Sequence, residues 1–386
     1  MDFTLDDDLR ALAELSGRIL TDFGEPAHLA KVEADHGGVD WQLWAALAEA
    51  GLLGIAVPER VGGAGMGMLG LVTLLEQQGR SVTPVPLWST AVAMQALVQF
   101  GSAELVDHWL PELLTGSTVL SCAFATSPGE TAVATATANG AGWLVRGDLG
   151  PVPAGDIAEA ILLPAVTEGG ELIMVVLRTK QTGVHITRIG VTSRESYALV
   201  CLDGAQVDAG QRLPGDGSRI LEWTVRRARV ALAALQLGVC AQALRMTADY
   251  TAKRVQFGRP LATNQAVTQR AADGYLDVEG IRLTTQRAAL LMDGEHTDEE
   301  PKAALTAKWW AATAGLRVVH TAQHLHGGIG ADIDYPIHRY FLWGRQLAFT
   351  MGSAGAIAAE LGIELAHGAS IGAPALTEPR HTEPAS

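Results

Sequence analysis

The sequence predicts an α+β protein in which a β domain separates two helical domains. Apolar residues recur every three or four positions between Val225 and Met246, as on the buried face of a long helix. Near Ser117 the pattern changes to short alternating runs rich in Thr, Val and Gly, and from Ser218 it is helical again. We therefore expect an N-terminal helical domain at 1–115, a β domain at 116–214, a four-helix bundle at 215–370 and a disordered tail at 371–386.

The N-terminal domain contains five stretches with helical periodicity. They predict helices at Leu9–Phe23, Trp41–Ala50, Met68–Gly79, Ser89–Phe100 and Ala103–Thr115. The glycine-rich stretch 61–70 contains a formal Gly-x-Gly-x-x-Gly, the pattern of dinucleotide-binding loops. Because no β-α-β unit surrounds it, we interpret this stretch as a loop before a helix.

The β domain contains eight short strand candidates separated by turn residues. A small barrel or sandwich would close such a set. The candidates are Val119–Phe124, Thr131–Ala138, Trp143–Val145, Ala160–Leu163, Leu172–Leu177, Val184–Thr187, Ala198–Cys201 and Gln206–Val207.

The C-terminal domain begins with a helical hairpin. Its first helix ends near Gly258, where glycine and then Pro260 interrupt the helical pattern, and a second helix follows through Ile281. At the bend lie Arg254, Phe257 and Gln265, which are a cation, an aromatic ring and an amide. These side chains suit a flat ligand that carries phosphate.

Composition excludes several classes of protein. The formal net charge of −14 disfavours nucleic acid as a partner, because phosphate binding needs clustered Lys and Arg. No apolar run approaches twenty residues, so we expect no membrane span. The acidic N-terminus is unlike a signal peptide, and three widely spaced cysteines, Cys122, Cys201 and Cys240, suggest reduced thiols and a cytoplasmic location.

Two motifs carry a resemblance to a known family. One is Arg254-x-x-Phe-Gly-x-Pro followed by Gln265, and the other is His326-Gly-Gly-Ile-Gly followed by Tyr335-Pro-Ile-His-Arg-Tyr. Together they resemble the acyl-CoA dehydrogenase family over nearly the whole chain. The resemblance implies the fold of that family, FAD as cofactor and an acyl-CoA substrate. It also implies FAD-binding roles for Arg254, Phe257, Gln265, His324, Gly327 and Gly328.

The base that the family uses to remove a proton has no counterpart here. The usual glutamate lies in a Tyr-Glu-Gly-Thr-like run, and Met351 occupies its place in this sequence. Some relatives carry the base on the first hairpin helix, where Ala228 stands. Neither side chain accepts a proton, so we expect no catalytic residue on this chain. Glu222, upstream of Ala228, is an alternative base, although a solvated carboxylate is the simpler interpretation.

The loops that hold the flavin ring in the family are also altered. Residues 125–131 lack the usual Ser-Asp, and Leu149–Val152 lacks the tryptophan. This combination resembles the base-lacking subunit of bacterial heterotetrameric steroid side-chain acyl-CoA dehydrogenases. The resemblance implies a homologous catalytic subunit as partner and a steroid side-chain acyl-CoA as substrate. Two alternatives are a self-sufficient homotetramer with an unorthodox base such as Glu222, and a flavin-free scaffold.

Three histidines, His320, His324 and His326, raise the question of a metal site. The zinc-protease pattern needs glutamate at position 321, where the chain has Thr321. We expect no metal, and we interpret these histidines as capping or nucleotide-contacting residues.

Overall fold

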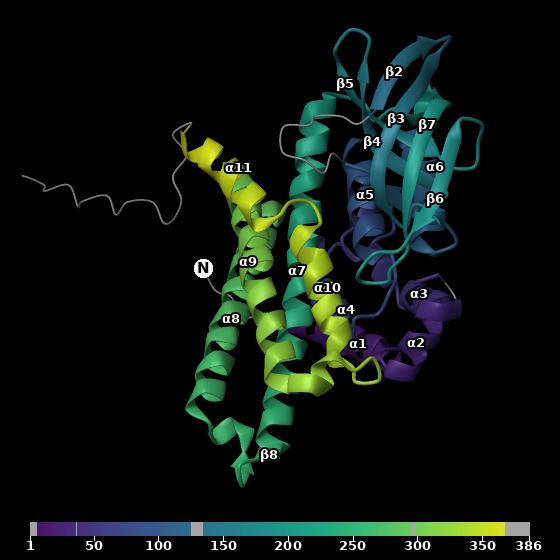
Figure 1. The fold of residues 1–386 in the computed structure, drawn as a ribbon. Helices are drawn as coiled ribbons and strands as arrows, with labels where there is room; N and C mark the ends of the chain where they lie inside the picture. Colours follow the sequence, from purple (N-terminus) through teal and green to yellow (C-terminus); the bar gives the residue numbers. More distant parts are fainter. Residues whose placement is uncertain (1–5, 36, 125–133, 295–297, 367–386) are drawn as a thin grey trace, which may run out of the picture.

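The computed structural model describes residues 6–35, 37–124, 134–294 and 298–366. A group of N-terminal helices, a curled β-sheet and a bundle of long helices follow one another along the chain (Figure 1). This arrangement confirms the predicted α+β class. The expected tail at 371–386 and residues 125–133 lie outside the described residues.

The N-terminal region is helical, as expected, with one helix more than the sequence predicts. The additional helix, α2, begins at a proline, which suits the first turn of a helix, but it is short and only weakly amphipathic. Asp6 and Asp40 cap α1 and α3 by accepting hydrogen bonds from the backbone amides of Leu9 and Leu43. The helices are α1 (Asp7–Asp22), α2 (Pro26–Asp35), α3 (Trp41–Glu49), α4 (Gly67–Ser81), α5 (Leu87–Phe100) and α6 (Ala103–Leu114).

The strands of the middle region form one mixed sheet. Its order is β1-β4-β2-β3-β7-β6, and β5 pairs with β4. Two predicted pieces, Ala198–Cys201 and Gln206–Val207, belong to the single strand β7. The strands are β1 (Leu120–Cys122), β2 (Ala134–Asn139), β3 (Gly142–Pro153), β4 (Ala160–Thr167), β5 (Leu172–Arg178), β6 (Val184–Ile189) and β7 (Tyr197–Asp208).

The C-terminal bundle is built around α7, which has 37 residues. Helix α4 crosses it at a pair of glycines. A Cβ built on Gly79 would lie 2.1 Å from the carbonyl oxygen of Leu235, and one on Gly238 would lie 2.0 Å from that of Glu76, so only glycine allows this approach. The bundle elements are α7 (Gly217–Lys253), β8 (Val255–Gln256), β9 (Arg259–Pro260), α8 (Gln265–Asp293), α9 (Glu300–His326), α10 (Ile337–Phe349) and α11 (Ala354–Ala366).

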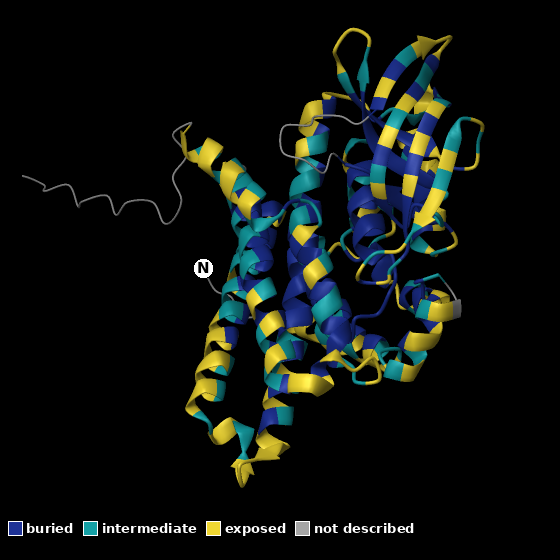
Figure 2. Ribbon diagram, in the orientation of Figure 1, coloured by how far each residue is buried: buried dark blue, intermediate teal, exposed yellow. Residues whose placement is uncertain are grey.

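Helix α7 is also the one described helix that is long and apolar enough to cross a membrane by length and composition. The sequence contains no uninterrupted apolar run of that length, because charged residues interrupt the segment. In the fold, 72% of its most apolar window is buried against other helices. Its apolar character is therefore accounted for by its place in the core (Figure 2).

Candidate functional site

The bend between α7 and α8 projects from the end of the bundle that lies away from the sheet (Figure 1). Arg254 is the residue at which α7 ends, and the two-residue strands β8 and β9 follow it. Phe257 is 94% exposed and has a φ of +53°, and Gly258 completes the turn. An exposed phenyl group on a left-handed backbone is unusual and indicates a contact surface.

The first turn of α8 adds hydrogen-bond donors beside this bend. Gln265 is the first residue of α8, and Asn264 before it makes no side-chain capping bond. The backbone amide of Val267 donates to the carbonyl oxygen of Asn264 at 2.9 Å, so the amides of Gln265 and Ala266 are the ones in this uncapped first turn that are left to attract an anion. Arg254 makes no ion pair with any described residue, so its guanidinium is available to a ligand. Together these groups suit a diphosphate.

The predicted glycine block lies next to the same bend. The ring of Tyr250, on the last turn of α7, stacks on His326 at 4.6 Å between centroids, and Gly327 follows His326 directly. Gly327 has a φ of +65°, which favours glycine, and a Cβ built on Gly327 or Gly328 meets no atom within 4 Å. The backbone is therefore open to a ligand. We call the surface formed by Arg254–Gln265 and His324–Gly328 the hairpin end, and most of its bend is exposed (Figure 2).

The three histidines of α9 point to different neighbours. His320 packs edge-on against Phe341, and His324 Nδ1 lies 2.8 Å from Arg270 Nη1. Because arginine only donates, Nδ1 accepts and His324 Nε2–H remains free for a ligand. His326 is buried, and burial lowers its pKa, so it is neutral. Within the described ranges, no group of three His, Cys, Asp or Glu side chains could hold a metal ion.

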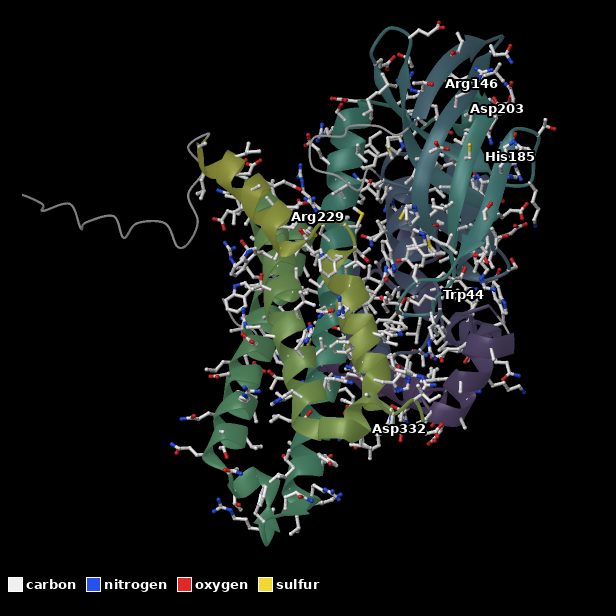
Figure 3. All side chains as sticks on the ribbon, viewed as in Figure 1. Trp44, Arg146, His185, Asp203, Arg229 and Asp332 are labelled. Atoms are coloured by element: carbon white, nitrogen blue, oxygen red, sulfur yellow. The ribbon has the colours of Figure 1, made fainter. Side chains whose placement is uncertain are left out.

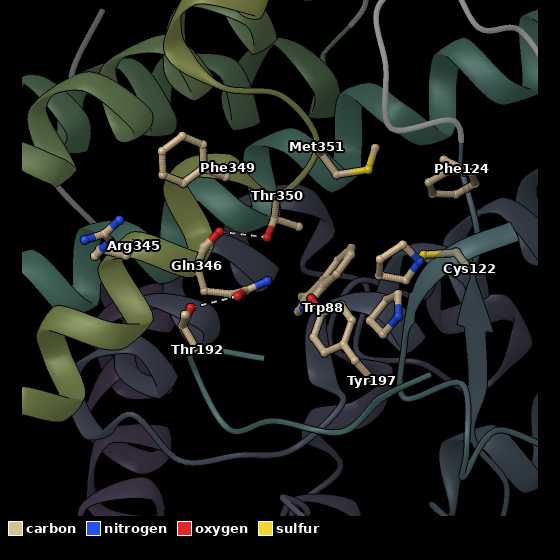
Figure 4. Close-up of a pocket in the computed structure, with 12 residues that line it drawn as sticks. Trp88, Cys122, Phe124, Thr192, Tyr197, Arg345, Gln346, Phe349, Thr350 and Met351 are labelled. Atoms are coloured by element: carbon tan, nitrogen blue, oxygen red, sulfur yellow. Dashed lines mark hydrogen bonds between the residues drawn. The ribbon is translucent and has the colours of Figure 1, made fainter. Parts of the chain in front are cut away.

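A second feature lies where α10 meets the sheet and α5. It is a cavity of about 340 Å³ (Figure 4). Its walls come from α5, β1, β3, the first residue of β7 and the segment before it, and the C-terminal end of α10. The lining residues are Trp88, Cys122, Phe124, Pro151, Pro153, Thr192, Tyr197, Arg345, Gln346, Phe349, Thr350 and Met351.

This cavity contains Met351, the residue at the expected glutamate position. Among its described lining residues there is no carboxylate and no imidazole. Burial raises the pKa values of Cys122 and Tyr197 above their ordinary ranges, so both stay protonated at neutral pH. The described part of the cavity therefore offers no proton acceptor.

The two other positions considered as sites of a base are unsuited to that role. Ala228 is fully buried in α7. The side chain of Glu222 is 67% exposed and pairs with Arg226 at 3.0 Å. Glu222 does not line the cavity, and a solvated ion pair explains its presence.

A buried lysine and a partly buried arginine hold the turn that carries Met351, and neither has a signal in the sequence. Lys308 Nζ donates to the carbonyl oxygen of Leu347 at 2.8 Å, and burial lowers the pKa of Lys308 to about 7. Arg229 Nε donates to the carbonyl oxygen of Met351 at 3.3 Å, while its Nη atoms bind both oxygens of Glu360. These bonds occupy carbonyl oxygens at the end of α10. Met351 itself has a φ of +59°.

Of the two segments expected to hold the flavin ring, the structure describes one. Residues 125–131 lie outside the described residues, and Leu149–Val152 lies within β3 rather than in a loop. The β3–β7 pairing shifts register between Asp148 and Pro151, and Pro151 enters the cavity wall. Proline removes an amide donor at this position.

The hairpin end and the cavity lie far apart within the chain. Arg229, beside Met351, lies in the half of the bundle nearer the sheet, and Asp332, just after the glycine block, lies in the half nearer the bend (Figure 3). From Arg229 to Arg254, α7 rises about 38 Å.

Comparisons with known proteins match both the N-terminal and the C-terminal parts of this chain. Residues 6–117 match the family described as "Acyl-CoA dehydrogenase, N-terminal domain", and residues 215–359 match "Acyl-CoA dehydrogenase, C-terminal domain". The chain is 38% identical to acyl-CoA dehydrogenase FadE27 of Mycobacterium tuberculosis, over 95% of this chain and 99% of the relative.

Two solved structures are also similar over 95% of this chain and 99% of theirs. One comes from the ChsE4-ChsE5 complex of Mycobacterium tuberculosis, with 37% identity and a TM-score of 0.90. The other is a variant of the protein described as "Tcur3481-Tcur3483 steroid ACAD", with 43% identity and a TM-score of 0.87. The likeness therefore extends through the helices and the sheet alike.

Proposed function

Because the chain belongs to the acyl-CoA dehydrogenase family, whose cofactor is FAD, we propose that it is the base-lacking subunit of a heterotetrameric acyl-CoA dehydrogenase. In this proposal the chain binds the adenosine and diphosphate of FAD at its hairpin end. The flavin ring and the acyl-CoA bind mainly to a homologous catalytic subunit, which also supplies the base.

The observation that carries this proposal is the cavity at Met351. Dehydrogenation of an acyl-CoA requires a base that removes a proton next to the thioester, and bound FAD accepts the hydride. The described lining offers no such base, because Met351 presents a thioether and the ionisable groups of Cys122 and Tyr197 hold their protons. Loss of a general base typically costs about 10²- to 10⁴-fold in rate.

The hairpin end fits the other half of the cofactor. Arg254 would pair with the diphosphate, and the open first turn of α8 at Gln265 would donate backbone amides to it. Phe257 would cover the nucleotide, His324 would donate through Nε2, and Gly327 and Gly328 would let the backbone approach the ribose or phosphate. Because this region is about 38 Å along α7 from the cavity, its flavin ring would lie on another subunit.

Two similar structures support a partner and a substrate class. The description of each structure names two proteins, and one of the two structures is described as a steroid ACAD. We therefore assign the substrate as a CoA thioester of a steroid side chain and the product as the corresponding 2,3-enoyl-CoA.

Flavin content tests the proposal against its alternatives. The chain purified alone should carry little FAD, whereas the chain co-purified with its catalytic partner should carry about one FAD per heterodimer, measured by absorbance. A yellow, active chain without any partner would establish a self-sufficient enzyme. A stable complex that binds no flavin at all would establish a scaffold.

A further inference from the structure

The proposed function leaves the cavity at Met351 without a role, although the cavity has a defined shape and polarity. Figure 4 shows Arg345, Gln346 and Thr192 on one side and Trp88, Cys122, Phe124 and Tyr197 on the other. The cavity therefore has an apolar interior and a polar mouth, whose three polar side chains lie beside the exposed ring of Phe349. Its volume of about 340 Å³ is within the range of small-molecule sites.

The polar mouth presents hydrogen-bond donors. Arg345 is exposed and lies over the ring of Phe341, at 5.7 Å, and it pairs with no carboxylate in the described part of the chain. Gln346 Oε1 accepts a bond from Thr192 Oγ1 at 2.9 Å. That bond fixes the amide so that its nitrogen is turned toward Trp88 (Figure 4). A cation and an oriented N–H favour an oxygen acceptor, above all a carboxylate.

The apolar interior is rigid. Trp88, Cys122, Phe124 and Tyr197 are each at most 5% exposed, so their side chains are held by the core. Pro151 and Pro153 add two ring walls from β3. Such walls match a ligand with fused rings better than a flexible chain, because a rigid ligand loses less conformational freedom on binding.

We propose that this cavity is a separate, non-reacting ligand site that binds a carboxylate with a rigid polycyclic apolar body. The rings lie between Trp88, Tyr197 and Met351, and the carboxylate lies at Arg345 and Gln346. The ligand leaves unchanged, because the described lining holds no proton acceptor. The site belongs to this chain alone and does not depend on the half-site assigned to the hairpin end.

The test is binding of 1-pyrenebutyrate to the full-length chain, measured by fluorescence anisotropy. The uncharged 1-pyrenemethanol is measured in the same way, and the flexible palmitate, which has no fluorophore, is measured by its displacement of bound pyrenebutyrate. We expect saturable binding of pyrenebutyrate and weaker binding of palmitate. Arg345→Gln should weaken pyrenebutyrate about fivefold and leave pyrenemethanol unchanged, since an exposed cation contributes a modest charge-assisted contact. Met351→Trp, which fills the cavity, should weaken both pyrene ligands at least about tenfold.

The matched control is Arg60→Gln, which neutralises an exposed arginine away from the cavity and should change nothing. Circular dichroism melts establish that each variant is folded, and Arg345→Gln alone decides the charge contact if Met351→Trp does not fold. Unchanged affinity in Arg345→Gln, tighter binding of palmitate, or displacement of pyrenebutyrate by equimolar FAD would each overturn the proposal.

Discussion

The two ends of the bundle differ in how their polar groups are satisfied. Near the cavity, the buried Lys308 and the partly buried Arg229 donate hydrogen bonds to the carbonyl oxygens of Leu347 and Met351. At the hairpin end, Arg254 has no described ion-pair partner and Phe257 is 94% exposed. The backbone of the turn at Met351 is therefore held by side chains of the same chain, whereas Arg254 and Phe257 at the hairpin end make no comparable contacts with described residues.

This contrast teaches that the residues that stabilise the chain and the residues proposed to bind FAD lie in different regions. A substitution near the cavity should change the free energy of unfolding of the chain itself. A substitution at the hairpin end should leave folding unchanged and alter FAD binding in the complex. Each prediction below tests one side of this separation.

The largest expected effect on stability is that of Lys308→Met. The folded pKa of Lys308 is about 7, below the ordinary lysine value of 10.5, so between these pH values the unfolded chain binds the extra proton. The free energy of unfolding therefore rises with pH from about 7 to about 10.5. Methionine removes this penalty and also the bond to Leu347, so the variant should be more stable by about 3 kcal/mol at pH 7.

The measurement is urea denaturation of parent and variant at pH 7 and pH 9.5, because the difference cancels other titrating groups. The gain should shrink strongly at the higher pH. A variant that is less stable at both pH values would show that Lys308 contributes more as a cap of α10 than it costs as a buried amine.

Next in size is the effect of Arg254→Ala on FAD. Loss of a charge-assisted contact with the diphosphate costs about 1.5–3 kcal/mol, which is about a ten- to hundredfold loss of FAD affinity in the complex. Assembly should survive, because the buried residues of α7 are untouched. FAD retention and dehydrogenase activity of the co-purified complex are the measurements.

Glu222→Ala is the matched control for this variant, since Glu222 lies on the same helix but is exposed and, among the described residues, forms an ion pair with Arg226 alone. It should leave FAD and turnover unchanged. If instead it abolishes turnover while Arg254→Ala retains FAD, this chain carries its own base.

A smaller effect is expected for Phe257→Ala. The exposed phenyl group contributes nothing to the core, so unfolding of the chain alone should change by less than about 0.5 kcal/mol. In the complex, loss of an aromatic contact should weaken FAD about two- to tenfold. Equal destabilisation of the isolated chain would show that Phe257 packs within its own subunit.

The smallest expected effect is that of Met351→Glu on activity. A carboxylate at this position restores the base but not the contacts with the flavin ring, so the variant without a partner should still oxidise no acyl-CoA. The assay is reduction of an artificial electron acceptor with added FAD. Measurable turnover would show that the cavity of this chain accepts the flavin ring after all.

Elements with a regular apolar spacing or a clear breaker could be predicted from the sequence. The apolar spacing between Val225 and Met246 identified α7, and the Phe257–Pro260 breaker identified its end within a few residues. Helix α2 was missed because a short, weakly amphipathic segment has little periodicity to detect. The division of β7 into two pieces arose because the register between β3 and β7 is irregular.

The cavity could not be predicted, because residues far apart in the chain line it. Trp88, Pro151 and Tyr197 meet Met351 only after the sheet and α5 are packed against α10. Lys308 also gave no signal, since a single lysine in a helical segment is ordinarily exposed. Motif spacing indicated the residues of the hairpin end, and their role in FAD binding stays a prediction.

The exposed phenyl group of Phe257 also has a consequence for production of the protein in the cell. A subunit without its partner presents this ring and the neighbouring Val255, which is 53% exposed, to water and to other chains. Such a surface promotes association and recognition by chaperones and proteases. We expect the two subunits to be needed in matched amounts, with any excess of this chain removed by degradation.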